Sequence, residues 1–176
     1  MPPLVHLRAA TLDDTEFLAA VYAATRMEEL AVTGWSDEQK AEFCWMQFTA
    51  QDSHYRQHYP TAEYCVIEVS GTPVGRLYVD RWSREIRIMD IAILPQHCGN
   101  GIATHLLDSL QSEAADTRQS LSIHVERFNP ALRFYERLGF RLTEDKGVYL
   151  LMEWTPAGWP QVKIASNSDP CGPSAT

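Results

Sequence analysis

The sequence has few cysteines and few basic residues, and it has no apolar run long enough to cross a membrane. Its four cysteines lie far apart, without a Cys-x-x-Cys pair or a histidine at metal-ligand spacing, so neither a disulfide framework nor a metal site is expected. The 15 lysines and arginines are scattered and outnumbered by 23 acidic residues, which argues against a nucleic-acid partner. The N-terminus lacks the features of a signal peptide. These absences predict a reduced, cytoplasmic protein without membrane contacts.

The sequence does contain enough apolar material for one core. Its 176 residues are 45% hydrophobic, and the length leaves no room for a second full domain. Residues 1–155 are expected to form this single domain. The Pro, Gly and Ser content of residues 156–176 predicts a tail with little structure of its own. The net charge of −8 mildly favours an amine-bearing or cationic partner.

Hydrophobic periodicity predicts a mixture of strands and helices. Strands are expected at 5–8, 64–69, 74–79, 85–94, 121–125, 140–142 and 148–154, and helices from residue 13 or 14 onward, over 37–58, from about 101 and over 130–138. Ser-Gly-Thr-Pro between the second and third strands is typical of a hairpin turn. The strand at 85–94 becomes apolar on both faces, which predicts a central place in the sheet.

A glycine-rich turn joins the strand at 85–94 to the next helix. The stretch IMDIAILPQHCGNGIATHLLDSLQ, residues 88–111, places Gly99 and Gly101 where unpaired N–H groups at the helix start can surround a phosphate. A P-loop is excluded because the turn contains no lysine. A dinucleotide-binding turn would need a third glycine at Thr104, although Glu126 could imitate its ribose-binding acid. A tight turn without a ligand is the remaining alternative.

Two motifs in order decide between these alternatives. The turn reads CGNGIA at residues 98–103, and a second motif, NPALRFYERLGF, follows at residues 129–140. Together they resemble the signatures of the GNAT superfamily of acetyl-CoA-dependent N-acetyltransferases, and the resemblance extends over residues 5–154. It implies an α/β (α+β) GNAT fold. In that fold a mixed, mostly antiparallel sheet is flanked by helices and splayed between the strands that end near Leu94 and Val125.

The resemblance also implies how acetyl-CoA, the cosubstrate, is bound. Backbone groups of residues 91–93 pair with the pantetheine arm, N–H groups of residues 99–104 hold the pyrophosphate, and Asn129 lies beside the pantetheine or the thioester. Cys98 stands where the family usually has Arg or Gln, so one side-chain contact to phosphate is expected to be missing. The implied cofactor-binding residues are Ile91, Ala92, Ile93, Cys98, Gly99, Asn100, Gly101, Ile102, Ala103, Thr104, Asn129 and Tyr135.

Acetyl transfer to an amine requires a proton for the departing thiolate and removal of a proton from the amine. Tyr135 is expected to donate the proton to the departing thiolate, because its face of the short helix points toward the sheet. A packed core tyrosine is the alternative interpretation. His124 falls where some relatives place a catalytic glutamate, and histidine suits proton removal near neutral pH. A histidine satisfied within the strand is an equally good interpretation.

Asp90 is the second candidate base, because burial in an apolar run favours proton uptake by a carboxylate. A salt bridge with Arg84 or Arg87 is the alternative interpretation. Glu85 and Glu126 are outer candidates for the same role.

The acceptor pocket is expected between the first two helices and their connection. Its predicted walls are Tyr22, Met27, Glu28, Glu29, Trp35 and Phe48. Either glutamate could receive a cationic group of the acceptor, although a solvated acidic helix face is the simpler interpretation.

The leading hypothesis is direct transfer of an acetyl group from acetyl-CoA to a primary amine of a small molecule or peptide within a ternary complex. Cys98 is not expected to act as a nucleophile, because its position faces the pyrophosphate. The enzyme is expected to be a monomer or a homodimer. A non-catalytic acyl-CoA sensor and a dinucleotide-binding oxidoreductase are the competing hypotheses.

Overall fold

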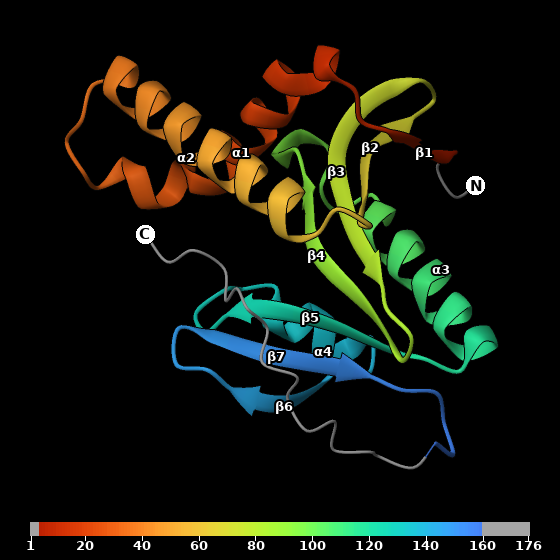
Figure 1. Ribbon diagram of the computed structural model, residues 1–176. Helices are drawn as coiled ribbons and strands as arrows, with labels where there is room; N and C mark the ends of the chain where they lie inside the picture. Colours follow the sequence, from red (N-terminus) through yellow and green to blue (C-terminus); the bar gives the residue numbers. More distant parts are fainter. Residues whose placement is uncertain (1–3, 160–176) are drawn as a thin grey trace.

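The computed structural model describes residues 4–159, so the predicted tail lies outside the described residues from residue 160 onward. Seven strands form one sheet in the order β1-β2-β3-β4-β5-β7-β6 (Figure 1). The strands are β1 Val5–Ala9, β2 Glu63–Val69, β3 Thr72–Arg81, β4 Glu85–Ile93, β5 Ser120–Glu126, β6 Arg141–Asp145 and β7 Tyr149–Trp154. The helices are α1 Thr15–Ala31, α2 Asp37–His58, α3 Ile102–Thr117 and α4 Leu132–Arg137, with short 3₁₀ turns at Leu12–Asp14 and Pro95–His97.

The sheet is mixed and mostly antiparallel, as predicted. Every neighbouring pair is antiparallel except β4 and β5, which run parallel. The strand β4 is the fourth of seven, which confirms its predicted central position. The close approach of β3 to β4 depends on Gly75, because a Cβ there would lie 2.3 Å from the carbonyl oxygen of Ala92.

Helices cover both faces of the sheet and create two cores. On one face α1 and α2 pack together over β2, with Leu18, Phe48 and Val66 buried between them. On the opposite face α3 and α4 cover the larger core, where Leu107 and Tyr135 pack among strand residues (Figure 1). The apolar spacing of α1 and α3 therefore does direct one face of each helix into a core.

Helix boundaries agree with the sequence patterns except at α4. The helix α2 spans the predicted residues, and Ser36 begins it by accepting a hydrogen bond from the N–H of Gln39 at 3.2 Å. The α-helix α4 begins at Leu132, two residues beyond the predicted start. The reason is that Asn129 closes a separate turn, in which its side-chain oxygen accepts from the N–H of Ala131 at 2.9 Å. Gly139, with φ 90°, ends the helix as predicted.

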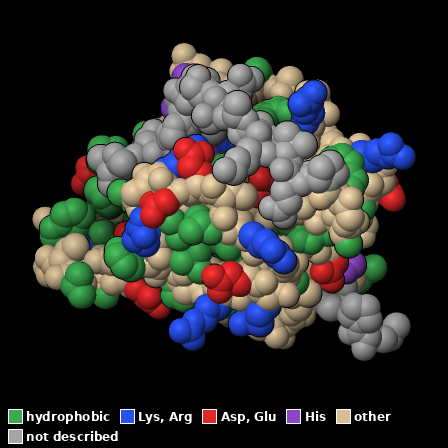
Figure 2. Space-filling view, turned by 90° about the horizontal axis from the view of Figure 1, so that it is seen from below, with side chains coloured by type: hydrophobic (Ala, Val, Ile, Leu, Met, Phe, Trp, Pro, Cys, Tyr) green, Lys and Arg blue, Asp and Glu red, His purple; other side chains and the backbone are tan. Residues whose placement is uncertain are grey.

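One face of the molecule shows how its charged side chains are distributed. On the face shown in Figure 2, the Lys and Arg side chains lie apart from one another and are interspersed with Asp and Glu. This agrees with the scattered basic residues of the sequence.

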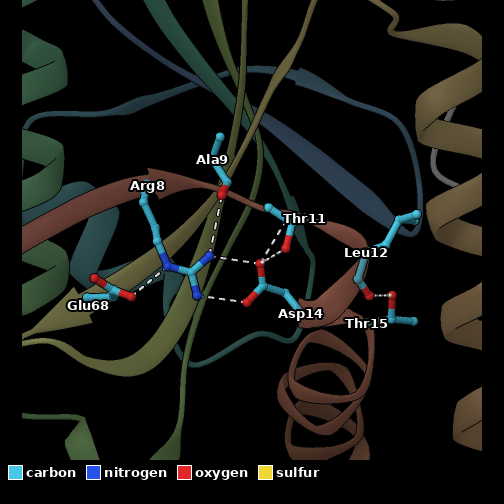
Figure 3. Close-up of polar contacts among 7 residues, drawn as sticks. All are labelled: Arg8, Ala9, Thr11, Leu12, Asp14, Thr15 and Glu68. Atoms are coloured by element: carbon cyan, nitrogen blue, oxygen red, sulfur yellow. Dashed lines mark hydrogen bonds and ion pairs between the residues drawn. The ribbon is translucent and has the colours of Figure 1, made fainter.

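A charged cluster fixes the corner between β1 and α1 (Figure 3). The Arg8 guanidinium donates to both carboxylate oxygens of Asp14, at 2.7 and 2.8 Å, and to Glu68 on β2 at 2.6 Å. Asp14 also accepts from the N–H of Thr11 at 2.8 Å. These donors hold the pKa of Asp14 well below its usual range, chiefly through Arg8. The cluster therefore sets the direction in which α1 leaves the sheet.

Asp14→Asn is expected to lower the melting temperature at neutral pH by about 4–8 °C, the equivalent of about 2 kcal/mol. Because the folded-state pKa of Asp14 is depressed, its contribution is complete above the unfolded pKa and is lost as pH falls. The gap between wild type and variant should thus be full above about pH 5 and should shrink below about pH 4. Thermal melts across that range test this, and a gap independent of pH would contradict it.

Candidate active site

The parallel strands β4 and β5 separate partway along their length. They pair from Glu85 with Ser120 to Ile88 with Ile123, and beyond these residues neither strand pairs with the other. On its other side β4 contains a bulge, since Ile88 pairs with Val79 and Asp90 with Tyr78, leaving Met89 between them. The predicted splay is therefore confirmed, and it begins at the bulge.

The edge of β4 that faces the splay offers backbone hydrogen-bonding groups. The N–H of Leu94 donates to Val74 on β3 at 2.8 Å. Because peptide groups alternate along an antiparallel strand, those of Ile91 and Ile93 face the splay, whereas those of Ala92 face β3. Two of the three residues predicted to pair with a cofactor thus have the required orientation.

The splay leads to the glycine turn before α3. Gly99 and Gly101 have φ of 78° and 76°, a region that favours glycine. Along this turn the N–H groups of residues 99–104 donate to no acceptor among the described residues, and the first paired amide is that of His105, which donates to Gly101 at 2.9 Å. Free amides and the positive end of the α3 dipole therefore converge, which favours an anion.

The Cys98 side chain turns back from these amides. Its exposed thiol lies 3.5 Å from the carbonyl oxygen of Ile93 and 3.6 Å from that of Leu94. The Asn100 side chain likewise turns inward and donates to the carbonyl of His97 at 3.1 Å. The turn therefore presents backbone donors to a ligand, and no cationic side chain from position 98 joins them.

A cleft of ≈ 820 Å³ continues from the splay toward α1 and α2. Of the predicted acceptor walls, Tyr22, Glu28 and Glu29 line this cleft. Phe48 is buried in the core beneath α1 and α2, and Met27 and Trp35 are exposed elsewhere, so these three predictions are wrong. Further lining residues that were not expected lie on α2, namely Gln51, His54 and Tyr55, and directly after it, namely Tyr59. Gln51 and Tyr55 follow Phe48 at helical spacing, which was the available signal.

Tyr135 lines the cleft from α4. Its ring is buried beside Phe134 and Phe140, with centroids 5.4 and 5.7 Å away, and it also lines the cleft. Its hydroxyl makes no hydrogen bond with another described residue. Burial first, and the charge of Asp90 second, hold the pKa of Tyr135 well above its usual range. The phenol therefore keeps its proton at any pH at which the protein operates.

Asp90 lies at the bulge and is paired with an arginine that the sequence analysis did not propose. Arg76 on β3 donates through Nε to Oδ1 at 3.2 Å and through Nη2 to Oδ2 at 2.8 Å. Neither Arg84 nor Arg87 is its partner, because Arg87 lies farther back along β4, where it binds Glu85 at 2.7 Å. The carboxylate of Asp90 thus lies in the cleft as one half of an ion pair.

His124 lies across the splay from Asp90 on β5. Its Nδ1 is 3.2 Å from Nη1 of Arg87. Because a guanidinium only donates, this contact requires Nδ1 to accept, and a neutral ring then carries its proton on Nε2. The basic nitrogen is therefore directed at Arg87, which disfavours His124 as the base. Glu126, an outer candidate, pairs with Arg26 on α1 at 3.5 Å.

Asn129 is the first residue of the second motif and lies just before α4. It lines the cleft next to Pro130, while its side-chain oxygen holds the turn before α4. Its side-chain amide nitrogen has no hydrogen bond within the described residues, so it can donate into the cleft.

Comparison with known proteins agrees with this geometry. Residues 22–140 match the model of the acetyltransferase (GNAT) family. The chain belongs to the GNAT acetyltransferase family. No curated protein is detectably similar to it in sequence.

Solved GNAT structures share the fold at low sequence identity. The PaiA N-acetyltransferase of Thermoplasma acidophilum, in complex with coenzyme A, superposes with a TM-score of 0.67 at 16% identity, covering 86% of this chain and 99% of that one. An acetyltransferase from Thermus thermophilus gives 0.65 at 19% identity, covering 89% and 100%. A GNAT acetyltransferase from Elizabethkingia anophelis with acetyl-CoA bound gives 0.56 at 15%, covering 86% and 98%.

Two further findings concern the described part of this GNAT chain. Within residues 4–159, no three His, Cys, Asp or Glu side chains are grouped as metal ligands would be. No helix in the same range has the length and apolar character needed to span a membrane.

Proposed function

We propose that the protein is an N-acetyltransferase that moves an acetyl group from acetyl-CoA to a primary amine by direct attack in a ternary complex. The observation that carries this is the continuity of the splay with the glycine turn. The open edge of β4 leads directly to a row of amides at the start of α3 that have no acceptor within residues 4–159. Two structural relatives were crystallised with coenzyme A or acetyl-CoA, which supports the same ligand here.

Acetyl-CoA fits the donors of this site in two places. Peptide groups of Ile91 and Ile93 would pair with the amides of the pantetheine arm, as an added strand pairs with a sheet edge. The N–H groups of residues 99–104 would hold the pyrophosphate at the positive end of α3. Asn129 would donate to the pantetheine near its thioester end. Bound in this way, acetyl-CoA supplies an activated acetyl group and a thiolate that must be protonated.

Tyr135 is the residue that we assign to that protonation. It is buried, keeps its proton, and has a hydroxyl with no hydrogen bond to another described residue. A phenol of raised pKa is a weak acid in the ground state, but the thiolate develops in the same buried site, where desolvation raises the pKa of its thiol as well. Tyr135 would therefore donate its proton as the sulfur leaves.

Asp90 is the residue that we assign to the acceptor amine. Its carboxylate faces the cleft at the bulge, whereas the basic nitrogen of His124 faces Arg87. Asp90 would accept a hydrogen bond from the amine N–H, and the proton released on attack would pass through it to water in the cleft. Glu28 and Glu29 on α1 give the entrance negative charge, which favours an amine that arrives as a cation.

Binding and turnover test this function separately. Isothermal calorimetry is expected to show CoA binding and no NAD binding. Thiol release from acetyl-CoA, followed with a panel of polyamines, aminoglycosides, amino acids and peptide N-termini, is expected to identify the acceptor. Absence of CoA binding would overturn the proposal. CoA binding without thiol release to any amine would leave a binding protein instead of an enzyme.

Cys98→Arg is expected to tighten CoA binding about fivefold, because one exposed charge-assisted contact to phosphate is worth about 1 kcal/mol. The thiol now turns back to the carbonyls of Ile93 and Leu94, so the position has room for a side chain directed at the turn. Calorimetry at low and high salt checks this, since the gain should shrink as salt screens the charge. Cys98→Ser is the control. Unchanged or weaker affinity in the arginine variant would show that position 98 does not face the phosphates.

A further inference from the structure

We propose that Arg76 is a positioning residue that holds one edge of the Asp90 carboxylate so that its other edge meets the acceptor amine. The proposal rests on the function proposed above. It adds a residue outside both sequence motifs, on the neighbouring strand β3, to the machinery that orients the acceptor.

The Arg76 guanidinium is fixed from three sides. Its side chain is only 2% exposed in the centre of β3. Its Nη2 group donates both to Asp90 and to Oε1 of Gln51 on α2, the second at 3.0 Å. The rings of Tyr78 and Tyr22 lie 5.1 and 5.8 Å from its Cζ atom. The guanidinium plane therefore has one orientation, which a flexible surface arginine would not have.

Arg76 is a poor choice for stability alone. Of its five N–H donors, three are used by Asp90 and Gln51, while Nη1 is buried and has no hydrogen-bond partner among the described residues. Removing a charge from water and leaving donors unpaired opposes folding, and apolar residues often replace such pairs without loss. A buried arginine of this kind therefore points to a role in the cleft that it faces.

The opposite edge of Asp90 is open to the acceptor. Its side chain is 18% exposed, and Arg76 is its only hydrogen-bond partner within the described part of the chain. A carboxylate can accept about four hydrogen bonds, and Arg76 uses one lone pair on each oxygen. The remaining lone pairs are available on the cleft side of the ion pair.

Three buried phenols surround the Asp90 carboxyl group. The charge of Asp90 acts on the hydroxyl groups of three tyrosines, Tyr55 on α2, Tyr78 on β3 and Tyr135 on α4. Burial raises the pKa of each of them. All three phenols are therefore neutral. An amine bound to the free edge of Asp90 lies between α2 and the Tyr135 side of the cleft, where attack and thiolate protonation take place together.

The test compares Arg76→Met with Arg76→Lys, using n-butylamine as a minimal acceptor in the thiol-release assay. Arg76→Met is expected to raise the KM for n-butylamine about 10- to 100-fold, while the Kd for CoA stays within about twofold. Arg76→Lys should recover part of the loss, because it restores the charge without the fork. Arg81→Met is the control on the same strand, since Arg81 pairs with Glu63 and Glu113 outside the cleft. An unchanged KM for n-butylamine in Arg76→Met would overturn the proposal.

A double variant separates positioning from a structural role. If the ion pair only supports the fold, Arg76→Met combined with Asp90→Asn should recover both the melting temperature and the KM, because no uncompensated charge remains. If Asp90 binds the amine, the double variant recovers the melting temperature but keeps the raised KM. Recovery of both would overturn the proposal.

Gln51→Leu, which removes one support of Arg76, gives a milder check and should raise the same KM a few-fold. A wild-type protein that binds CoA but transfers no acetyl group would contradict the proposed function itself.

Discussion

Tyr135→Phe is expected to lower kcat for acetyl transfer about 100- to 1,000-fold, the range lost when a positioned general acid is removed. The ring stays buried between Phe134 and Phe140, and only the hydroxyl is lost, so packing and CoA affinity should change little. Single-turnover thiol release measures the chemical step, and calorimetry measures CoA binding. An equal loss in both would show that the hydroxyl binds the cosubstrate instead of protonating the thiolate.

The raised pKa of Tyr135 also determines how kcat for the same step should respond to pH. Because burial raises the pKa of Tyr135, the acid stays protonated as pH rises through about 10, the usual value for tyrosine. The wild type should therefore show no loss of kcat from this residue up to the alkaline limit of the fold. Tyr64→Phe is a matched control, since burial raises the pKa of Tyr64 to about 12 but Tyr64 does not line the cleft, and its hydroxyl is already used in a hydrogen bond to the carbonyl of Tyr59. That control should keep its kcat.

The double variant Gly99→Ala/Gly101→Ala is expected to weaken CoA binding about 100-fold, because each alanine disfavours the left-handed backbone by about 1–2 kcal/mol. A Cβ at either glycine meets no atom within 4 Å, so the cost comes from the backbone angle and not from a clash. The turn would relax toward negative φ, and the amides of residues 99–104 would no longer converge on one anion. Calorimetry with CoA checks this result.

A second pair of glycines isolates that effect. Gly34 and Gly71 have φ of 68° and 80° and also have open space around the Cβ position. Gly34→Ala/Gly71→Ala should lower the melting temperature about as much as the first double variant while leaving CoA affinity unchanged. Equal loss of affinity in both pairs would mean that the glycine turn acts only through overall stability.

The motifs and the element order could be read from the sequence because they depend on local patterns. The Ser-Gly-Thr-Pro turn between two β-rich runs identified the hairpin of β2 and β3, and Gly99 and Gly101 identified the turn before α3. The orientation of Asp90 could not be read in this way. Ile86 and Ile88 face the α3 core, and simple alternation would place Asp90 beside them. The extra residue Met89 reverses the pattern, so that Ile91 returns to that core and Asp90 faces the opposite side, with Arg76.

The acceptor wall on α2 was missed for a related reason. Phe48, Gln51 and Tyr55 lie on one face of the helix, and periodicity alone cannot tell where that face passes from core to cleft. The boundary between core and cleft depends on where α1 stops covering α2 and on where β4 and β5 separate. Both are tertiary features. Phe48 is therefore covered by Tyr22, with ring centroids 6.3 Å apart, while Tyr55, about two turns farther on, lines the cleft.

The short pairing between β4 and β5 divides the sheet into two parts that are joined only at one end of these strands. One part contains the strands β1, β2, β3 and β4, and the other contains β5, β6 and β7. Four residue pairs, from Glu85 with Ser120 to Ile88 with Ile123, join the two parts. Across the open part, the ion pair of Arg26 with Glu126 bridges α1 and β5. A molecule hydrogen-bonded along the free edge of β4 would link the two parts of the sheet. In the proposed mode, acetyl-CoA is both the acetyl donor and a structural member that completes the sheet.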